Sequence, residues 1–426
     1  MKFKRILTCA LTATILLSNL IPLQGIAAPN QNNTKIETQT KVLTDDAKSG
    51  MLHGVKEPSA ETKEWAKKNM KKIKAIKPNK VGLDRIKKVS PNINMDKVVP
   101  ADIGDELSTE SQNTEASPTK GSAPINTTNS IRAASASTSS TSANVAAAST
   151  ISTLTGSSLP NYVDNSQLDC FPPIRDQGGI GSCAAFSTTY YQLTHMTGLA
   201  LGWNTKDNQD NTNKMSPKWT YDFANYGYDS GSNETDIYRI LQENGCATWS
   251  DFPYSGDKTN PINYTQICQN KAVWENAFRY RIKECGTVPV DNVSSNKDQN
   301  LETIKNMLVD GYVLSFACMG FDFNSGYVMN DPSTSADDSF VGQCEVICMK
   351  SGPYGHQMTI VGYNDDIWID MNGNGTVEAG EKGAFRVADS YLNSFNNGFY
   401  WLSYDSVNST SSVPGFIAPP SGRTLS

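Results

Sequence analysis

Residues 177–187 read Gln-Gly-Gly-Ile-Gly-Ser-Cys-Ala-Ala-Phe-Ser, a glycine-rich loop that runs into an apolar segment at Cys183. After the cysteine, Phe186, Tyr190 and Leu193 recur at the spacing of one helix face. The pattern predicts a helix whose first turn carries Cys183.

The ends of this helix are also marked in the sequence. Ser182 is a candidate N-cap, and Gly198 is a residue that can end the helix. A thiolate in the first turn lies at the positive end of the helix dipole, among backbone N–H groups that lack helical partners. Gln177, six residues before the cysteine, can place a side-chain amide beside the sulfur as an oxyanion donor. These features predict that Cys183 is an activated nucleophile.

A cysteine near a helix start is more often a buried apolar residue or half of a disulfide. Here the polar, glycine-rich approach favours an accessible thiol. The stretch also resembles the active-site segment of the papain-like cysteine peptidases, Gln-Gly-x-x-Gly-Ser-Cys-x-Ala-Phe-Ser, and the resemblance extends over roughly residues 159–405. Two positions depart from the family pattern. Ala184 replaces the usual tryptophan, and Ile180 stands where many relatives have a cysteine, so their first disulfide cannot form.

The resemblance implies an α+β fold of two lobes with a peptide-binding cleft between them. A helical lobe would carry the Cys183 helix, and a β-rich lobe would carry the catalytic histidine. Within the helical part, Gly231 lies in a glycine/serine segment and is a candidate residue of the substrate groove.

A cysteine nucleophile needs a base, and the chain has three histidines, His53, His195 and His356. His53 lies in the N-terminal leader. His195 follows Cys183 on the same predicted helix by a distance of about 18 Å, too far for a hydrogen bond, and is expected to be a core or surface residue. His356 remains, at the start of a strand-like segment, residues 355–363. A histidine in this setting resembles the second family motif, which implies a thiolate–imidazolium pair with Cys183.

The residue that orients the imidazole is expected just after the next strand. The family has Asn-Ser-Trp-Gly there, whereas residues 383–391 place Asp389 at the asparagine position and Tyr391 at the tryptophan position. An aspartate can accept a hydrogen bond from the Nδ1–H of His356 and stabilise the imidazolium. Asn393 is the alternative if the register is shifted.

Residues 370–381 follow the twelve-residue calcium loop of EF-hands, with Gly375 at the sharp turn. The predicted ligands are Asp370, Asn372, Asn374, the carbonyl of Thr376, Glu378 and Glu381. The alternative is a polar surface loop of turn-forming residues. Because strand-like segments flank the loop, the sequence predicts Ca²⁺ on a hairpin that links the strands of His356 and Asp389. Calcium would then stabilise the fold and, indirectly, the site.

The chain divides into four predicted segments. A basic end followed by a short apolar run indicates a signal peptide over residues 1–28. A basic pro-segment follows over 29–107, then a Ser/Thr/Ala-rich linker over 108–158 that is a natural site for proteolytic cutting, and a peptidase domain over 159–426. Within the pro-segment, the best predicted helix runs from Ser59 to Ile76.

Charge is distributed unevenly between these segments. Residues 31–100 hold sixteen Lys and Arg against eight Asp and Glu, whereas residues 159–426 hold sixteen against thirty. A basic leader that precedes an acidic domain is expected to dock on it electrostatically. The alternative is a basic segment that is merely solvated or binds polyanions.

The sequence therefore predicts a secreted, monomeric cysteine endopeptidase made as a zymogen, with protein or peptide substrates and its own pro-segment as inhibitor. No nucleic-acid partner and no membrane span are expected, and retention at the cell surface is left open. Seven cysteines accompany Cys183 beyond the leader, so disulfides are permitted but their pairing is open. Two alternatives are a non-catalytic extracellular binding protein of the same fold and a cell-wall amidase with a similar Cys–His pair.

Overall fold

The computed structural model describes residues 54–56, 58–73, 79–89, 159–289, 297–319, 323–349, 355–392, 396–405 and 423–425. All of them belong to one compact unit, Thr38–Ser426. The predicted signal peptide and linker, His53 and Asn393 lie outside the described residues. Within the described ranges, every helix is too short or too polar to cross a lipid bilayer.

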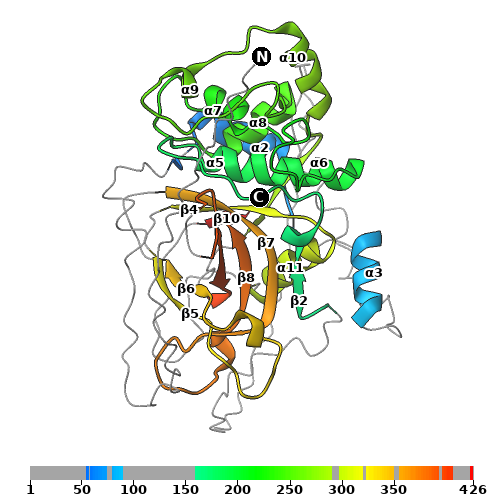
Figure 1. The fold of residues 1–426 in the computed structure, drawn as a ribbon, viewed down its shortest axis with the longest axis vertical. Coiled ribbons are helices and arrows are strands. Elements are labelled where there is room, and N and C mark those ends of the chain that lie inside the picture. The colour runs from blue at the N-terminus through cyan, green and yellow to red at the C-terminus, as the bar shows by residue number, and fades with distance from the viewer. Residues whose placement is uncertain are drawn as a thin grey trace, which may run out of the picture. The chain divides into compact units, whose positions relative to one another are not determined.

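Helices and strands separate into two lobes, which confirms the α+β, two-lobe prediction (Figure 1). The helical lobe has its own apolar core, in which Trp219 and Tyr221 are almost fully buried. Its elements are α5 (Cys183–Ala185), the π-helix η2 (Phe186–Leu193), α6 (Thr194–Leu201), α7 (Pro217–Ala224), α8 (Glu234–Asn244), α9 (Ile262–Thr265), α10 (Lys271–Ala277) and η3 (Phe278–Tyr280).

The helix of Cys183 is continuous but changes type along its length, because η2 has the wider π winding between two α-helical turns. It does not end at Gly198 as the sequence predicted, but at Gly202, which has the left-handed conformation (φ 69°) that favours glycine. Gly198 has another role. A Cβ atom there would lie 2.8 Å from the Cβ of Cys170, so glycine allows close packing at this point.

The β-rich lobe is built on one sheet. In the described part of the chain, ten strands pair in the order β1-β3-β10-β4-β7-β8-β9-β6-β5, and β2 pairs with β7. The elements of this lobe are β2 (Tyr162–Asp164), η1 (Asn165–Gln167), β3 (Cys285–Pro289), α11 (Lys297–Val309), β4 (Leu314–Met319), β5 (Phe323–Tyr327), η4 (Asp338–Phe340), β6 (Cys344–Met349), β7 (Gly355–Trp368), η5 (Ala379–Glu381), β8 (Lys382–Ala388), β9 (Phe399–Ser403) and β10 (Arg423–Leu425).

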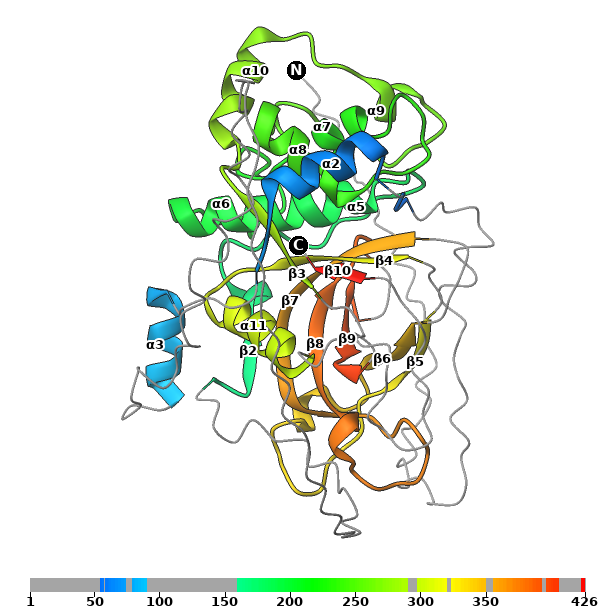
Figure 2. The same cartoon turned by 180° about the vertical axis from the view of Figure 1, so that it is seen from behind.

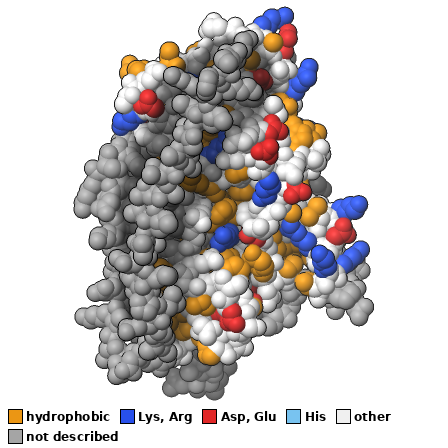
Figure 3. Space-filling view, in the orientation of Figure 1, with side chains coloured by type: hydrophobic (Ala, Val, Ile, Leu, Met, Phe, Trp, Pro, Cys, Tyr) orange, Lys and Arg blue, Asp and Glu red, His pale blue; other side chains and the backbone are white. Residues whose placement is uncertain are grey.

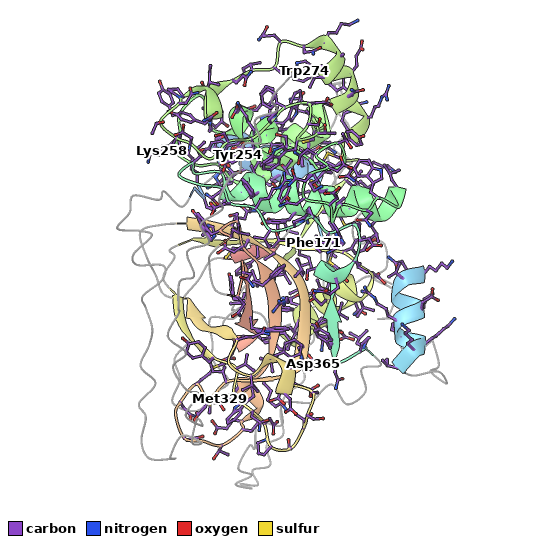
Figure 4. All side chains as sticks on the ribbon, in the orientation of Figure 1. Phe171, Tyr254, Lys258, Trp274, Met329 and Asp365 are labelled. Atoms are coloured by element: carbon purple, nitrogen blue, oxygen red, sulfur yellow. The ribbon has the colours of Figure 1, made fainter. Side chains whose placement is uncertain are left out.

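The centre of the sheet is the antiparallel set β4-β7-β8-β9. One face of β4 and β7 contributes Leu314, Phe316, Met358 and Ile360 to the core of the β-rich lobe. The opposite face meets the helix of Cys183, where Val361 packs with aromatic side chains of η2. In Figure 4, Phe171 lies where the two lobes meet, while Tyr254 lies in the helical lobe and Asp365 in the β-rich lobe. Side chains alternate between the two faces of β7, so this one strand packs both against the core of the β-rich lobe and against the helix of Cys183.

The leader contributes α2 (Ala60–Asn69), β1 (Met70–Lys72) and α3 (Lys80–Val89). Ser59 caps α2, since its hydroxyl accepts a hydrogen bond from the N–H of Thr62. The helix ends earlier than predicted, because the chain becomes extended at Met70 and pairs with β3. Figure 2 shows α2 lying across α8 of the helical lobe.

Candidate active site

Cys183 is the first residue of α5 and is fully buried, and its thiol is not in a disulfide. The sequence predicts that Ser182 caps this helix, but its side chain makes no capping hydrogen bond. The hydroxyl of Ser182 instead lies 2.7 Å from the hydroxyl of Tyr254, which also donates to the carbonyl of Gln177 at 2.6 Å. The loop before the nucleophile is thus held by an aromatic residue about seventy positions later in the chain.

His356 is the second residue of β7 and lies against Asp389, the residue that follows β8. Their contact joins Nε2 of the ring to Oδ1 of the carboxylate at 2.8 Å. The sequence prediction had the wrong ring nitrogen. The pairing of Thr359 with Ala388 brings the residue that follows β8 close to the beginning of β7, where His356 lies.

Cys183 acts on the same imidazole. Burial by itself lowers the pKa of His356, but the charge and hydrogen bond of Asp389, followed by the influence of Cys183, raise it to about 10. The ring of His356 is therefore an imidazolium at neutral pH, with Asp389 and Cys183 as the neighbours that favour its charged form.

Tyr391 covers the histidine. Its ring stacks on that of His356 with centroids 5.8 Å apart and an angle of 24° between planes. Tyr391, His356 and Asp389 are all at most 5 % exposed, so the hydrogen bond between the last two is shielded from water. The tyrosine takes the place of the tryptophan expected from the resemblance.

The side chain of Gln177 is fixed at both ends. Its Oε1 accepts from the hydroxyl of Ser390 at 2.5 Å, and its Nε2 donates to the carbonyl of Ile180 at 2.8 Å. The backbone N–H of Gln177 donates to the carbonyl of Ser390 as well. The residue next to Asp389 therefore sets the orientation of the amide.

His195 lies away from this site, in the interior of the molecule. Its Nε2 is 2.7 Å from the carbonyl of Gly311 and its Nδ1 is 3.5 Å from the sulfur of Cys170. Burial lowers the pKa of His195 to about 4, so this second Cys–His pair is neutral. It is a core histidine, one of the two outcomes expected from the sequence.

Gly231 lies against the leader. The carbonyl oxygen of Gly54 would be 2.1 Å from a Cβ atom at Gly231, which has a φ of 89°. The next residue, Ser232, donates its N–H to the same carbonyl at 2.6 Å. The backbone of the leader thus occupies the position where the sequence predicts a substrate groove.

The predicted calcium loop connects β7 to β8, and its two most buried acids are held by the loop backbone. Asp370 accepts N–H bonds from Gly373 and Gly375 at 2.7 and 2.8 Å. Glu381 accepts from Met371 at 2.7 Å. Among the described residues, no group of three or more His, Cys, Asp or Glu side chains is arranged to hold a metal ion.

A comparison with known proteins found a curated protein that is similar to this chain. No protein-family model matches the chain. The "Probable cysteine protease RDL6" of Arabidopsis thaliana is 26 % identical over 250 residues, which cover 56 % of this chain and 58 % of that protein. The chain spans a little under three fifths of the length of this curated relative.

Solved structures of two cysteine proteases are also similar to the chain. Xylellain from Xylella fastidiosa matches with 18 % identity and a TM-score of 0.40, over 63 % of this chain and 85 % of that one. The proform of Amb a 11, a ragweed pollen allergen, matches with 16 % identity and a TM-score of 0.37, over 57 % and 60 %.

Three features of this site did not follow from the sequence reasoning. Ser390 and Tyr254 hold Gln177, and Ser187 makes buried contacts with the strand of His356. The only sequence signal was proximity, since Ser390 follows Asp389 and Ser187 lies one helical turn after Cys183. Tyr254 carried no such signal.

We expect His356 and His195 to have very different pKa values. In a histidine-detected NMR titration, the ring of His356 should remain charged up to about pH 10, whereas His195 should remain neutral down to about pH 4. Asp389→Asn removes the largest influence that raises the pKa of His356, so this pKa should fall by about one unit or more. The exposed Asp257→Asn variant is the control and should change neither value. A wild-type His356 that titrates near its ordinary pKa would contradict the ion-paired site.

Proposed function

We propose that the chain is a cysteine endopeptidase made as a zymogen. The observation that supports this most directly is the contact of one buried imidazole with both Asp389 and Cys183. In the proposed reaction, the Cys183 thiolate attacks the peptide carbonyl carbon and forms a C–S bond. The C–N bond then breaks as His356 gives its proton to the leaving amine. Water, deprotonated by His356, hydrolyses the thioester and restores the thiolate.

The negative oxygen that develops in each step needs donors. We assign this role to the side-chain amide of Gln177 and the backbone N–H of Cys183, at the start of the helix. Gln177 is suited to it because Ser390 and Ile180 already fix its amide plane. Asp389 orients the imidazole and stabilises its charge, and Gly231 borders the groove for substrate.

The zymogen proposal is supported by the leader residues that lie in the cleft. Gly54 accepts from the N–H of Ser232 at 2.6 Å, and Val55 donates to the carbonyl of Gly355, next to His356, at 3.3 Å. Lys56 donates to the carbonyl of Ser232 at 2.8 Å. These backbone bonds connect the two lobes across the nucleophile and would block an extended substrate.

Further along the leader, polar contacts hold α2 on the helical lobe. Thr62 donates to the carboxylate of Asp236 at 2.5 Å, and Glu61 pairs with Arg239 at 2.9 Å. Burial lowers the pKa of the Lys56 ammonium, and the charges of Asp236 and Asp229 oppose this shift. The position of Lys56 near Asp236 and Asp229 agrees with the expectation that a basic leader docks on an acidic domain, whereas the Glu61–Arg239 pair has the opposite polarity.

The last described leader helix, α3, docks on the β-rich lobe. Its Arg85 donates to the carbonyls of Leu308 and Val309, both at 3.0 Å. Asn79, which precedes the helix, donates its N–H to Asp310 at 2.8 Å. In Figure 3, Lys and Arg side chains stand out at the edge where α3 lies.

Export, processing and assembly are parts of the same proposal. A signal peptide over residues 1–28 would direct the chain out of the cell, and cutting within residues 108–158 would release the leader. The domain over 159–426 would then act as a monomer on proteins or peptides. Retention of the fold without catalysis is the alternative, favoured by two of the departures from the family pattern, Ala184 and Asp389.

We further propose that Ca²⁺ binds residues 370–381, through the ligands predicted from the sequence. The pattern of oxygen side chains supports this, as does the way Asp370 already gathers backbone N–H groups inside the loop. Asn372 donates to Glu378 at 2.6 Å, so both side chains would have to turn to present oxygens to the ion. Calcium would then hold β7 and β8 together at the end far from His356.

Cys183→Ala should abolish peptide hydrolysis while leaving the melting temperature within about 2 °C of the wild type, because only the sulfur is lost. Activity would be measured on a peptide library, after removal of the leader. Labelling the wild type with a peptide chloromethyl ketone should modify Cys183 alone. Full activity of the alanine variant would refute the proposal, and selective peptide binding without turnover by the wild type would favour the non-catalytic alternative.

Gly54→Val should expose the nucleophile in the full-length chain. A Cβ atom at this position would lie 1.7 Å from the carbonyl oxygen of Gly181, so the leader strand must leave the cleft. Alkylation of Cys183 in the unprocessed chain should become at least about tenfold faster, equivalent to about 1.4 kcal/mol of lost docking. The matched control is Ala60→Val, at an exposed leader position. Equal rates in both variants would show that Gly54 does not hold the leader in place.

Chelation of calcium should lower the melting temperature and the activity together. At a calcium concentration a hundred times the Kd, binding stabilises the fold by about 2.7 kcal/mol. Asp370→Ala should have the lower melting temperature and no longer respond to chelator, whereas Asp257→Ala, an exposed turn residue, should respond like the wild type. No heat of calcium binding in calorimetry, with unchanged melting on chelation, would rule the site out.

A further inference from the structure

A cluster of hydroxyl groups lies buried between the helix of Cys183 and the strand of His356. At its centre is the hydroxyl of Ser187, which lies 2.6 Å from the carbonyl oxygen of Met358. It is also 2.8 Å from the hydroxyl of Ser315 and 2.9 Å from that of Thr359. Gln357 joins the cluster by donating its amide N–H to Ser315 at 2.5 Å. We call Ser187, Ser315, Gln357 and Thr359 the interlobe hydroxyl cluster.

The position of this cluster relates it to the reacting groups. Ser187 lies four residues after Cys183, about one helical turn, so the two move together. Met358 and Thr359 lie two and three residues after His356 on the same strand. The hydrogen bond from Ser187 to Met358 is therefore a short mechanical link between the nucleophile and its base.

The strand side of the cluster is itself fixed. Ser315 on β4 is paired directly with Thr359 on β7, and Ala317 with Gln357. These side chains share the sheet face that meets the helix, whereas Met358 and Ile360 point into the core of the β-rich lobe. The two strands thus present several polar groups to a single hydroxyl of the helix.

These polar groups have no access to water. All four residues of the cluster are at most 1 % exposed, and aromatic residues of η2 such as Phe186 and Tyr190 pack beside them. A buried hydroxyl that loses its partner is left without water or protein to replace it, so the bonds strongly favour one spacing of helix and strand. Apolar packing alone would tolerate small sliding movements, because dispersion contacts are less directional.

We propose that the interlobe hydroxyl cluster positions Cys183 relative to His356, so that the sulfur stays within hydrogen-bond distance of the imidazole. This inference rests on the proposed peptidase function and names positioning residues for it. The cluster touches neither substrate nor the reacting atoms. It acts by fixing the separation of the two lobes at the point where the ion pair forms.

The same helix offers a matched control. The hydroxyls of Thr189 and Thr220 lie 2.8 Å apart, and both residues are fully buried. This pair connects η2 to α7 within the helical lobe and does not reach the strand of His356. Loss of the Thr189 hydroxyl should therefore destabilise the fold without changing the separation of Cys183 and His356.

The test compares four variants of the full chain, each carried through removal of the leader. Ser187→Ala and Thr359→Val remove one cluster hydroxyl each, Thr359→Ser retains it, and Thr189→Val is the control. Two properties are measured on each, the kcat and KM for a peptide substrate and the rate of Cys183 alkylation by iodoacetamide as a function of pH. Alkylation reports on the Cys–His pair without any need for turnover.

We expect Ser187→Ala and Thr359→Val to lower kcat by about tenfold with KM changed less than twofold, because a small misplacement of reacting groups is costly. Since contact with Cys183 raises the pKa of His356, a larger separation lowers that pKa. The basic limb of the alkylation profile should accordingly move to lower pH. Thr359→Ser should restore both properties, and Thr189→Val should leave both unchanged.

The proposal is overturned if the cluster variants have lower melting temperatures but the same kcat and the same alkylation profile as Thr189→Val. If Ser187→Ala does not fold, the comparison of Thr359→Val with Thr359→Ser decides in the same way. If the wild type hydrolyses no peptide but the cluster variants still shift the pH profile of Cys183 alkylation relative to it, the peptidase function is refuted instead. The positioning role of the cluster would then be judged from the alkylation profiles alone.

Discussion

The geometry of the site depends on how one helical turn packs against the beginning of one strand. Asp389 and His356 come from paired strands, so the register of β7 and β8 holds them together within a single sheet. Cys183 comes from the other lobe, and no backbone pairing connects α5 to β7 in the described residues. Side-chain contacts between the two lobes must therefore fix the position of Cys183, as backbone hydrogen bonds between strands fix that of His356.

The neighbours of His356 give it its unusual charge. A fully buried imidazole would ordinarily be neutral, as His195 is, because desolvation penalises the charged form. His356 differs in that a carboxylate faces its Nε2, where His195 has a backbone carbonyl. An aspartate at position 389 provides a full negative charge where an amide would provide a dipole. The contrast between these two histidines shows that partners, more than burial, decide the protonation state.

Near Gly231, the leader contacts the rest of the chain through backbone groups more than through side chains. Gly54 and Gly231 approach so closely that neither tolerates a Cβ atom, and the hydrogen bonds beside them, such as that from the N–H of Ser232 to the carbonyl of Gly54, join main-chain groups. Main-chain contacts of this kind do not depend on side-chain identity, which suits both an inhibitor segment and a range of substrates. The more specific contacts lie further along, where α2 and α3 meet acidic residues of the two lobes.

The sequence determined the parts of this protein whose signals are local. The loop and helix at Cys183 and the strand of His356 follow from spacing and residue type within about fifteen residues, and Asp389 was expected from the resemblance to a family motif. The end of the helix at Gly202 was missed because Gly198 carries the same local signal, and only its close approach to Cys170 explains the difference. What the tertiary structure alone decided is which distant groups meet, namely the ring nitrogen that faces Asp389, the support of Gln177 by Tyr254, and the hydroxyls that join the lobes. These contacts depend on packing between segments more than seventy residues apart or on the rotamers adopted in a crowded interior. Neither leaves a trace in the order of residues along the chain.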